Sequence, residues 1–304
     1  MTKKQPLRRR EFMHMAARGA AWMAAGAAAP LALAKTDPTW KMQLACSSIN
    51  FSSLPIEKAI ARIAALGFDA VDIWSAHAGC PHLDDVLNRL GPNGLRAVLH
   101  THRIALYSFS VYQGGYPRYA ELLGKLGGGV AVRGSTALAD RRDLVPATNR
   151  FLESLKPELE LAEKYDSYLA IENHSGTPLL NYLDSFKALV DRIQHPRLGI
   201  ALAPYHIQKN GESVEEAISI CGKRLFFFYA WQNAPGTGQL PGIGPTDCRP
   251  WLKALARVGF RYPVVPFMHH EPAPDDMARS LTTSCHYLKS CYRQAVRGES
   301  APAP

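Results

Sequence analysis

The chain has 304 residues, of which 47% are hydrophobic and 20% are charged. This composition excludes an intrinsically disordered protein and is sufficient for one large buried core. The formal net charge is +9, but residues 1–34 hold six basic residues and one acidic residue, so the remainder carries a net charge of +4. No basic stripe interleaved with aromatic residues follows, and we therefore expect no nucleic-acid partner.

Residues 1–34 are typical of an export signal. Arg9 and Arg10 open a twin-arginine pattern, a segment rich in alanine and glycine runs to Pro30, and a small-x-small site ends at Ala34. The apolar segment is shorter than the roughly 20 strongly apolar residues that a spanning helix needs. We therefore predict a signal that passes through the twin-arginine (Tat) export machinery to the periplasm or the medium, with no permanent membrane anchor.

The cysteines are scattered and lack Cys-x-x-Cys spacing, so the sequence indicates neither a zinc knuckle nor a redox motif. An oxidising compartment would permit disulfides. No pair is predicted among the six, which are Cys46, Cys80, Cys221, Cys248, Cys285 and Cys291.

After the signal, strand-like and helix-like segments alternate with a period near 30 residues. Apolar runs rich in strand formers predict strands at 42–48, 68–74, 104–111, 130–135, 168–174, 198–203, 224–231 and 263–268. Helical spacing of apolar residues predicts helices at 55–66, 94–103, 117–126, 146–165, 182–193, 213–221, from 247 onward, and 275–296. Ser213 is a suitable N-cap because Glu216 stands three residues later.

Eight strands that alternate with eight helices predict an α/β fold of the (β/α)8 TIM barrel type at residues 35–299, followed by a short tail at 300–304. A doubly wound sheet is the alternative, but no Gly-x-Gly-x-x-Gly follows a strand. The connection that contains His77, Cys80 and His82 is unusually long.

Polar residues gather where the predicted strands end. The run Tyr168–Ile171 leads into Glu172, Asn173 and His174, so a buried strand delivers a carboxylate, an amide and an imidazole to one edge. In a barrel, the carboxyl ends of the strands form the face that carries chemistry. Six of the eleven histidines follow strands on this face, namely His77, His82, His174, His206, His269 and His270.

Glu172, His206, Gln232 and His269 follow the fifth to eighth predicted strands. Neighbouring strands lie about 5 Å apart, so these four side chains can meet around one ion. Their donor atoms suit manganese, cobalt, iron or zinc better than magnesium. The alternative is a hydrogen-bonded polar cluster that holds a neutral ligand. On the eighth strand, His270 and Glu271 compete with His269 for the inward position.

Three segments carry a resemblance to a known family. They are Ile171–His174, Gly199–His206 and Leu240–Asp247, the last followed by a Leu/Ala helix and Gly259-Phe260. Over residues 41 to about 293, the chain resembles the xylose isomerase-like TIM barrel family of sugar isomerases and epimerases. The resemblance implies a TIM barrel and a small-molecule carbohydrate substrate.

The resemblance also implies a ligand set. Family members hold a metal on a glutamate, an aspartate, a histidine and a glutamate after strands five to eight, and the two glutamates shuttle the proton. Glu172 matches the first position, whereas Ala203 stands at the aspartate and Gln232 near the histidine. His206 of the family motif is kept, and His269 replaces the last glutamate unless Glu271 reaches inward. Either the metal site has been rebuilt or the metal has been lost.

The residues at the other strand ends complete the expected site. Proton abstraction beside a sugar carbonyl needs a base and a group that stabilises the enolate oxygen. Glu172 or His269 is the expected base, and a metal would stabilise the oxygen. Hydroxyl binding or ring stacking is expected of Trp74, His77, Tyr112, Arg133 and His206, for which packing or solvation at a loop is the alternative.

The sequence therefore predicts an exported carbohydrate-active enzyme of the isomerase or epimerase type that uses metal-assisted proton transfer. One alternative is a lyase or hydrolase that acts on keto-glycosides at the same site. Another is a non-catalytic sugar-binding barrel, which Ala203 at the aspartate position favours. Export argues against a sugar phosphate as substrate. The individual sugar, the metal and the oligomeric state are left open.

Overall fold

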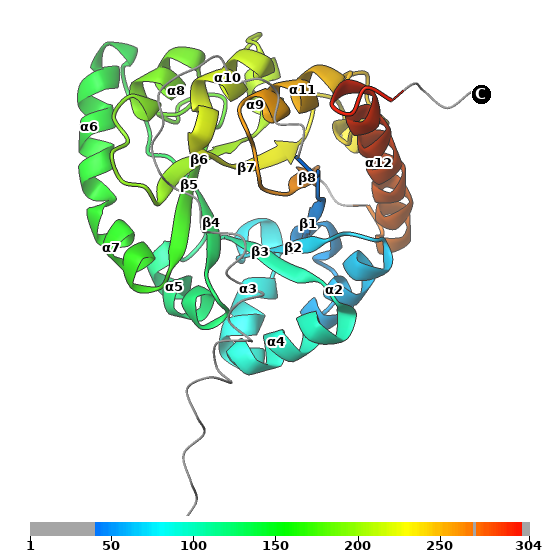
Figure 1. The fold of residues 1–304 in the computed structure, drawn as a ribbon. Helices are drawn as coiled ribbons and strands as arrows, with labels where there is room; N and C mark the ends of the chain where they lie inside the picture. Colours follow the sequence, from blue (N-terminus) through cyan, green and yellow to red (C-terminus); the bar gives the residue numbers. More distant parts are fainter. Residues whose placement is uncertain (1–39, 270–271, 300–304) are drawn as a thin grey trace, which may run out of the picture. The chain divides into compact units, whose positions relative to one another are not determined.

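The computed structural model describes residues 40–269 and 272–299. Its centre is a sheet of eight parallel strands whose spatial order is the same as their order in the chain (Figure 1). The strands are β1 (Ala45–Ser47), β2 (Ala70–Trp74), β3 (Ala105–Ser110), β4 (Gly129–Gly134), β5 (Ser167–Glu172), β6 (Leu198–Leu202), β7 (Leu225–Ala230) and β8 (Val264–Pro266).

The last strand returns to the first. A parallel bridge joins Leu44 to Val264, and the Val264 amide donates a hydrogen bond to the Gln43 carbonyl at 2.9 Å. This contact brings β8 beside β1. The expected (β/α)8 TIM barrel is therefore confirmed.

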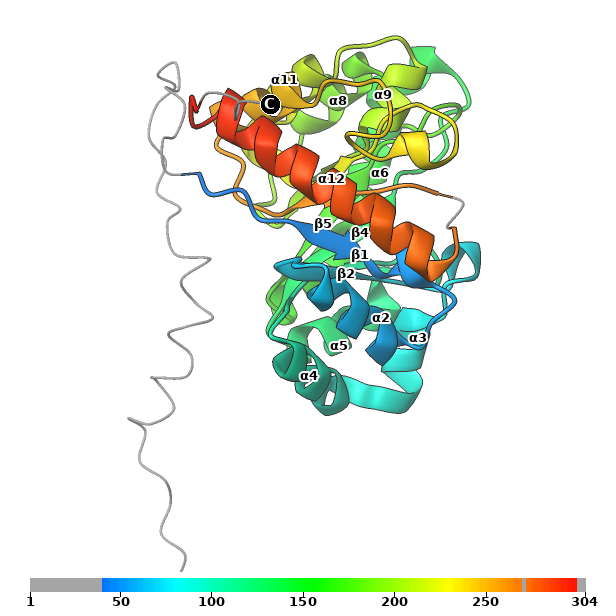
Figure 2. The ribbon, with the colours of Figure 1, turned by 90° about the vertical axis from the view of Figure 1, so that its right-hand side faces the viewer.

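Helices surround the strands (Figure 1), and the long α12 runs along the outer surface beside α11 (Figure 2). The α-helices are α2 (Ile56–Ala65), α3 (His82–Asp85), α4 (Gly91–His102), α5 (Gly115–Lys125), α6 (Leu144–Ser154), α7 (Lys156–Lys164), α8 (Leu183–Val190), α9 (Pro204–Lys209), α10 (Val214–Cys221), α11 (Arg249–Arg257) and α12 (Pro274–Ala295). No helix among the described residues combines the length and apolar content that a membrane crossing requires.

Buried apolar residues form two clusters, one inside the barrel and one between the strands and the helices. Strand β7 contributes side chains to both clusters. Phe227 and Tyr229 belong to the inner cluster, whereas Leu225 and Phe228 belong to the outer one. Because both faces are covered, all six residues of β7 are buried, which explains the uninterrupted apolar run in its sequence.

Three connections differ from the sequence-based expectation. The long connection after β2 is partly helical, with a 3-10 turn at His77–Gly79, α3, and a π-helical segment at Val86–Leu90. The expected helix at 146–165 is two helices, because Pro157 at the start of α7 lacks the amide that a continuous helix needs. Helix α9 occupies an expected loop.

One predicted helix cap and one glycine turn are present in the structure, whereas several other predictions fall on residues that the structure does not describe. The Ser213 hydroxyl accepts a hydrogen bond from the Glu216 amide at 3.1 Å, as the capping pattern predicts. The glycine turn before β4 is required by its backbone, since Gly128 has a φ of 84° and a Cβ there would lie 2.1 Å from the Asp166 carbonyl oxygen. The export signal, His270, Glu271 and residues 300–304 lie outside the described residues.

Candidate active site

A pocket of about 310 Å³ opens at the carboxyl ends of the strands, where the active sites of barrel enzymes lie. Six of the side chains singled out from the sequence line it: Trp74, His77, Tyr112, Glu172, His206 and His269. Five further residues complete the lining: His174, which was expected on this face without an assigned role, and Gly134, Ser135, Pro178 and Trp231, which were not expected.

Trp74, at the end of β2, forms one aromatic wall of this pocket. Its ring stacks on Phe267 with centroids 5.3 Å apart and lies 4.9 Å from the ring of Tyr112. The indole nitrogen donates a hydrogen bond of 2.6 Å to the carboxylate of Asp72. The wall is therefore fixed from beneath as well as from the side.

Trp231, just beyond β7, forms a second aromatic wall. Its ring stacks on Tyr205 with centroids 4.4 Å apart, and its indole nitrogen donates to the side-chain oxygen of Gln239 at 2.7 Å. The same oxygen accepts a hydrogen bond from the His269 amide at 3.1 Å. One buried amide side chain thus holds both Trp231 and the segment that carries His269.

A third wall comes from two loops that pair with each other. The loop after β4 and the loop after β5 form an antiparallel bridge between Ala137 and Pro178, with hydrogen bonds of 2.7 Å on either side of it. The His174 amide donates to the Leu180 carbonyl at 2.9 Å, which closes the second loop on itself. This pairing places Ser135, His174 and Pro178 at the pocket.

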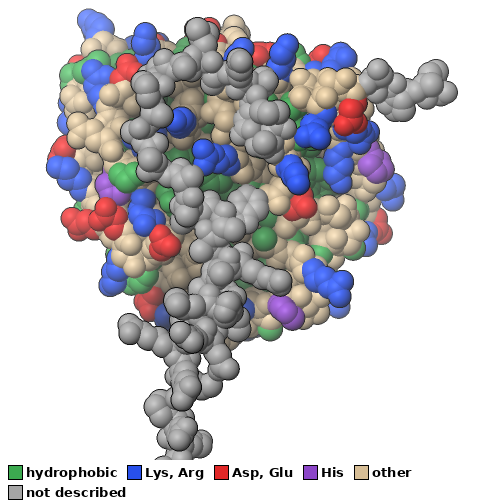
Figure 3. Space-filling view, viewed as in Figure 1, with side chains coloured by type: hydrophobic (Ala, Val, Ile, Leu, Met, Phe, Trp, Pro, Cys, Tyr) green, Lys and Arg blue, Asp and Glu red, His purple; other side chains and the backbone are tan. Residues whose placement is uncertain are grey.

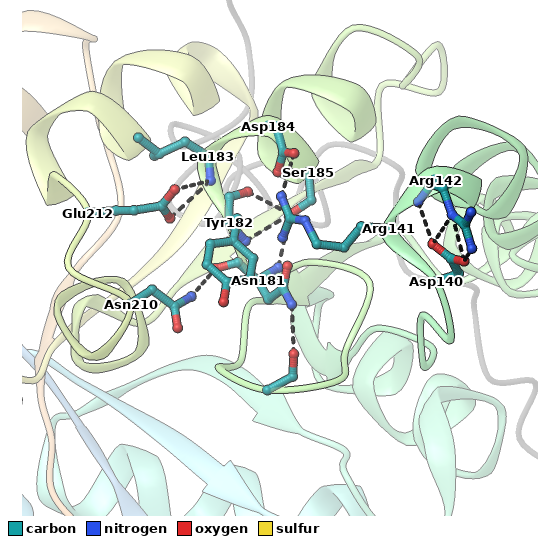
Figure 4. Close-up of polar contacts among 11 residues, drawn as sticks. Asp140, Arg141, Arg142, Asn181, Tyr182, Leu183, Asp184, Ser185, Asn210 and Glu212 are labelled. Carbon is teal, nitrogen blue, oxygen red and sulfur yellow. Dashed lines mark hydrogen bonds and ion pairs between the residues drawn. The ribbon is translucent and has the colours of Figure 1, made fainter.

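A polar cluster anchors these loops from outside (Figure 4). Arg141 pairs with Asp184 and covers the ring of Tyr182, with its guanidinium carbon 4.1 Å from the ring centroid. The Glu212 carboxylate accepts hydrogen bonds from the Leu183 amide, which satisfies a donor at the start of α8. Asn181, in the same cluster, donates to the Gly176 carbonyl at 2.8 Å. The loop that carries His174 is thereby joined to the helix layer.

Glu172 presents an acidic group to the pocket from the end of β5. Burial raises the pKa of its carboxyl to about 8, and the negative charge of Asp72 acts in the same direction. A hydrogen bond with Tyr112 lowers the pKa but does not overcome the burial. The carboxyl group is therefore mostly protonated at neutral pH, in a range where it can both release and accept a proton.

His206 is buried beside His174, with ring centroids 3.9 Å apart. The pKa of His206 is lowered to about 3, mainly by burial and to a smaller extent by the nearby His174 and His269. Its Nδ1 lies 3.1 Å from the Ser175 hydroxyl. His206 is therefore a neutral imidazole at physiological pH, able to exchange hydrogen bonds with a ligand without carrying charge.

A chain of hydroxyl groups leads from Glu172 into the barrel. The hydroxyls of Tyr112 and Tyr229 are 3.0 Å apart, and that of Tyr229 is 3.4 Å from the Ser110 hydroxyl. Ser110 in turn donates to both oxygens of Asp72 at 3.0 Å. Burial raises the pKa of both tyrosines well above the usual value, so both keep their protons.

Two residues expected at the site lie elsewhere. Gln232 accepts a hydrogen bond from the Thr246 amide at 2.7 Å and donates to the Leu240 carbonyl at 2.8 Å, so its amide fastens the following loop and does not line the pocket. Arg133 faces outward and pairs with Glu158 on α7. His82, counted among the histidines of this face, is buried against the Leu54 carbonyl at 2.8 Å.

The residues present do not fit the expected four-ligand metal site. Gln232 has both amide atoms engaged, and Ala203 offers no side-chain donor. Within residues 40–269 and 272–299, no group of three or more His, Cys, Asp or Glu side chains is arranged to hold a metal ion. His270 and Glu271, the other candidates from the eighth strand, lie outside the described residues.

Several residues around the site were not predicted from the sequence, although strand alternation indicates one of them. Strand β2 alternates between the outer cluster, with Val71 and Ile73, and the inner one, with Ala70 and Trp74. Asp72 has the inner parity, and a carboxylate at such a position marks a polar site inside the barrel. The position of Trp231 in the sequence does not indicate a pocket residue in the same way, because aromatic residues are common in protein cores.

The chain is a closed (β/α)8 barrel. Its pocket, lined by aromatic side chains and one carboxyl group, lies at the carboxyl ends of the strands, where enzymes of this fold carry their active sites. The model of the xylose isomerase-like TIM barrel family matches residues 60–291. The chain belongs to this family. A search of curated proteins gave no match.

Solved structures share the fold at low sequence identity. The chain is 22% identical to a xylose isomerase-like TIM barrel/4-hydroxyphenylpyruvate dioxygenase fusion protein, with a TM-score of 0.64, and the match covers 87% of this chain but only 45% of that one. It is 15% identical to 3-keto-D-glucoside 4-epimerase, YcjR, from E. coli (TM-score 0.62, covering 81% and 100%). It is 16% identical to the IOLI protein with a bound zinc atom (TM-score 0.66, covering 84% and 99%).

Charged side chains surround the pocket but are almost absent from its described lining. On the face shown in Figure 3, basic and acidic side chains are interspersed around the edge. Glu172 is the acidic residue of the pocket, and no Lys or Arg of the described part of the chain lines it.

Proposed function

We propose that this protein is a sugar isomerase or epimerase that transfers a proton next to the carbonyl of an uncharged sugar. The observation that carries the proposal is Glu172, a carboxyl group with a pKa of about 8 in an aromatic-walled pocket. Membership of the family and the names of its structural neighbours, which include epimerases, support the same class of reaction.

In the proposed reaction, ionised Glu172 removes the proton from the carbon beside the carbonyl. In an isomerisation the resulting acid delivers it to the former carbonyl carbon of the enediolate, while the hydroxyl proton passes from one oxygen to the other. About a tenth of the carboxyl groups are ionised at pH 7 when the pKa is about 8. Epimerisation needs a proton from the opposite face, and His269, which follows β8, approaches the ligand from another part of the barrel mouth than Glu172.

The enolate oxygen that forms needs hydrogen-bond donors in place. Neutral His206 lines the same pocket, and its ring N–H can donate a hydrogen bond to that oxygen. A neutral imidazole can polarise a carbonyl group in this way. The hydroxyl of Tyr112 is engaged with Glu172 instead. No step is assigned to a metal ion, because the described donor set does not fit one.

The test is exchange of the transferred hydrogen with solvent. D-Fructose and other ketohexoses are incubated with residues 35–304 in D₂O, and deuterium incorporation beside the carbonyl is followed by NMR. Incorporation by wild type and its loss in Glu172→Gln support the proposal. Saturable binding of a sugar without exchange would favour a non-catalytic sugar-binding barrel instead.

Elimination from a keto-glycoside is a second candidate. The similarity to a 3-keto-D-glucoside 4-epimerase supports a keto-glycoside as the substrate, and two tryptophan walls offer surface for both a sugar and its aglycone. Removal of the same proton by Glu172 would expel the aglycone in place of inverting the carbon. Release of the aglycone from a keto-glycoside, with no exchange into free ketohexoses, would decide for this reaction.

We further propose that residues 1–34 direct the protein to the periplasm through the twin-arginine pathway. The proposal rests on Arg9, Arg10 and the apolar segment that ends at Ala34. Replacing both arginines by lysine should leave the protein in the cytoplasmic fraction, whereas wild type reaches the periplasm with its N-terminus near Lys35. Equal periplasmic yields of the two would contradict this route.

A further inference from the structure

Asp72 is a fully buried carboxyl group that none of the proposed steps uses. It lies in the middle of β2 and has an exposed fraction of 0%. Its oxygens accept hydrogen bonds from Ser47 at 2.7 Å, Ser108 at 2.8 Å, Ser110 at 3.0 Å and the indole nitrogen of Trp74 at 2.6 Å. Donors from three neighbouring strands thus converge on one carboxylate.

The four donors favour the ionised form of the carboxyl, whereas burial favours the protonated form. Burial raises the pKa of Asp72, and the four donors oppose that effect, which leaves the pKa at about 6. Asp72 is therefore mostly ionised at neutral pH and can only accept hydrogen bonds. The short bond from Trp74 is charge-assisted, the stronger kind of hydrogen bond.

The four donors differ in what they can do without the carboxylate. Each serine hydroxyl can rotate and act as an acceptor, whereas the indole N–H of Trp74 can only donate. Trp74 is also the donor whose ring lines the pocket. Loss of the Asp72 carboxylate would therefore affect Trp74, which faces the ligand pocket, more than it affects the serines.

We propose that Asp72 is a positioning residue that holds the Trp74 indole in place as a wall of the ligand pocket. Asp72 does not touch the ligand and acts through Trp74, which Phe267 supports by stacking on its ring. The inference deepens the proposed function, on which its consequence for sugar binding rests. The position of Trp74 itself does not depend on that function.

Trp231 provides an internal reference for this inference. Its indole nitrogen donates to the side-chain oxygen of Gln239 at 2.7 Å. The acceptor of the Trp231 indole is therefore a neutral amide, whereas the acceptor of the Trp74 indole is a carboxylate. No described hydrogen bond joins Gln239, which follows β7, to Asp72 or its four donors, although both indole rings pack against Phe267. A change at Asp72 should therefore alter the hydrogen bond of the Trp74 indole and leave that of the Trp231 indole in place.

The test compares wild type with Asp72→Asn by the ¹H–¹⁵N NMR signals of the indole groups in residues 35–304, with Trp74→Phe and Trp231→Phe as assignments. The Trp74 indole proton should lie downfield in wild type and move upfield in Asp72→Asn, while the Trp231 signal stays. Asp191→Asn, the same substitution at an exposed carboxyl after α8, is the matched control and should leave both signals in place. An unchanged Trp74 signal in folded Asp72→Asn would overturn the inference.

Ligand handling gives a second readout. With D-fructose in the exchange assay, Asp72→Asn should raise KM about tenfold, the size expected for one charge-assisted hydrogen bond. The comparison is made at a pH well above the midpoint of Glu172, where the lower pKa of that carboxyl in Asp72→Asn does not alter kcat. In the Trp74→Phe background, the same substitution should have no further effect on KM, because Asp72 acts through Trp74. Additive effects of the two substitutions would contradict the inference.

The two readouts separate the inference from the proposed function. If wild type exchanges no hydrogen with any sugar tested but the Trp74 indole responds to Asp72→Asn, the proposed function fails and the positioning role stands. If Asp72→Asn does not fold, Trp74→Phe tests the same bond from its other end, since leaving Asp72 without its shortest donor should raise the pKa of that carboxyl. An unaltered Asp72 titration in Trp74→Phe would then overturn the inference.

Discussion

Asp72 and Glu172 are two carboxyl groups of the barrel interior whose surroundings lead to opposite protonation states. Asp72 has four side-chain donors and a pKa of about 6, whereas Glu172 has Tyr112 as its one side-chain donor among the described residues and a pKa of about 8. Burial raises the pKa in both cases. The number of donors, more than the depth of burial, therefore decides which carboxyl is ionised at pH 7.

This difference corresponds to two kinds of task. An ionised and fully bonded carboxylate such as Asp72 fixes the side chains around it. A protonated carboxyl such as Glu172, with a pKa near the working pH and access to the pocket, can exchange a proton with a ligand. The hydroxyl chain through Tyr112, Tyr229 and Ser110 connects the two groups.

The largest effect is expected from removing the acid of this pair. Glu172→Gln should lower the exchange rate about 10³-fold, within the range for loss of a general acid or base. The amide keeps the shape of the side chain but cannot take up the proton. Glu160→Gln, on the exposed side of α7, is the matched control and should retain wild-type activity. A Glu172→Gln variant with normal exchange would break the distinction between the two carboxyls.

The ionisation of Asp72 should also change the free energy of unfolding with pH. Its folded-state pKa is raised from 3.8 to about 6, so its contribution to stability is present below pH 3.8 and is lost as the pH rises through 6. The shift corresponds to about 3 kcal/mol. Wild type should therefore lose about 3 kcal/mol relative to Asp72→Asn between pH 3.5 and pH 7, as measured by urea unfolding. A constant difference between the two proteins would contradict the assigned pKa.

The pH dependence of exchange sharpens the comparison further. The rate should rise with pH through a midpoint near 8, because ionised Glu172 is the base. Tyr112→Phe removes a hydrogen bond that lowers this pKa, so the midpoint should move to higher pH. Asp72→Asn removes a like charge that raises it, so the midpoint should move to lower pH. Shifts of the same sign in both variants would refute this account of the two environments.

The smallest effect is expected far from the site. Ser213→Ala removes the hydroxyl that accepts from the Glu216 amide at the start of α10. The free energy of unfolding should fall by about 1 kcal/mol. The exchange rate of the folded protein should not change, which makes this variant a control for effects that act through stability alone.

Local pattern was enough to predict the barrel. Strand β7 is apolar at every position because both of its faces are covered, and Ser213 starts α10 as its sequence indicates. Glu172 shares its parity in β5 with Ala170 of the inner cluster, so its place at the pocket follows from alternation.

Contacts between distant residues limited the prediction of the site. Gln232 stands at a strand end as a ligand would, but the loop that follows it returns to its amide through Leu240 and Thr246. Arg133 shares its parity in β4 with Ala131, which packs in the outer cluster, and it finds Glu158 on α7. Alternation could have excluded Arg133, whereas nothing local predicts the fold of the loop over Gln232.

The most direct test of the central claim is the protonation state of Glu172, measured by infrared difference spectroscopy of wild type against Glu172→Gln. The account predicts a carboxylic acid C=O band at pH 7 that is absent from the variant and disappears with a midpoint near pH 8. A carboxylate band at pH 7, with no protonated form above pH 5, would contradict the role of Glu172 as the acid and base of this site.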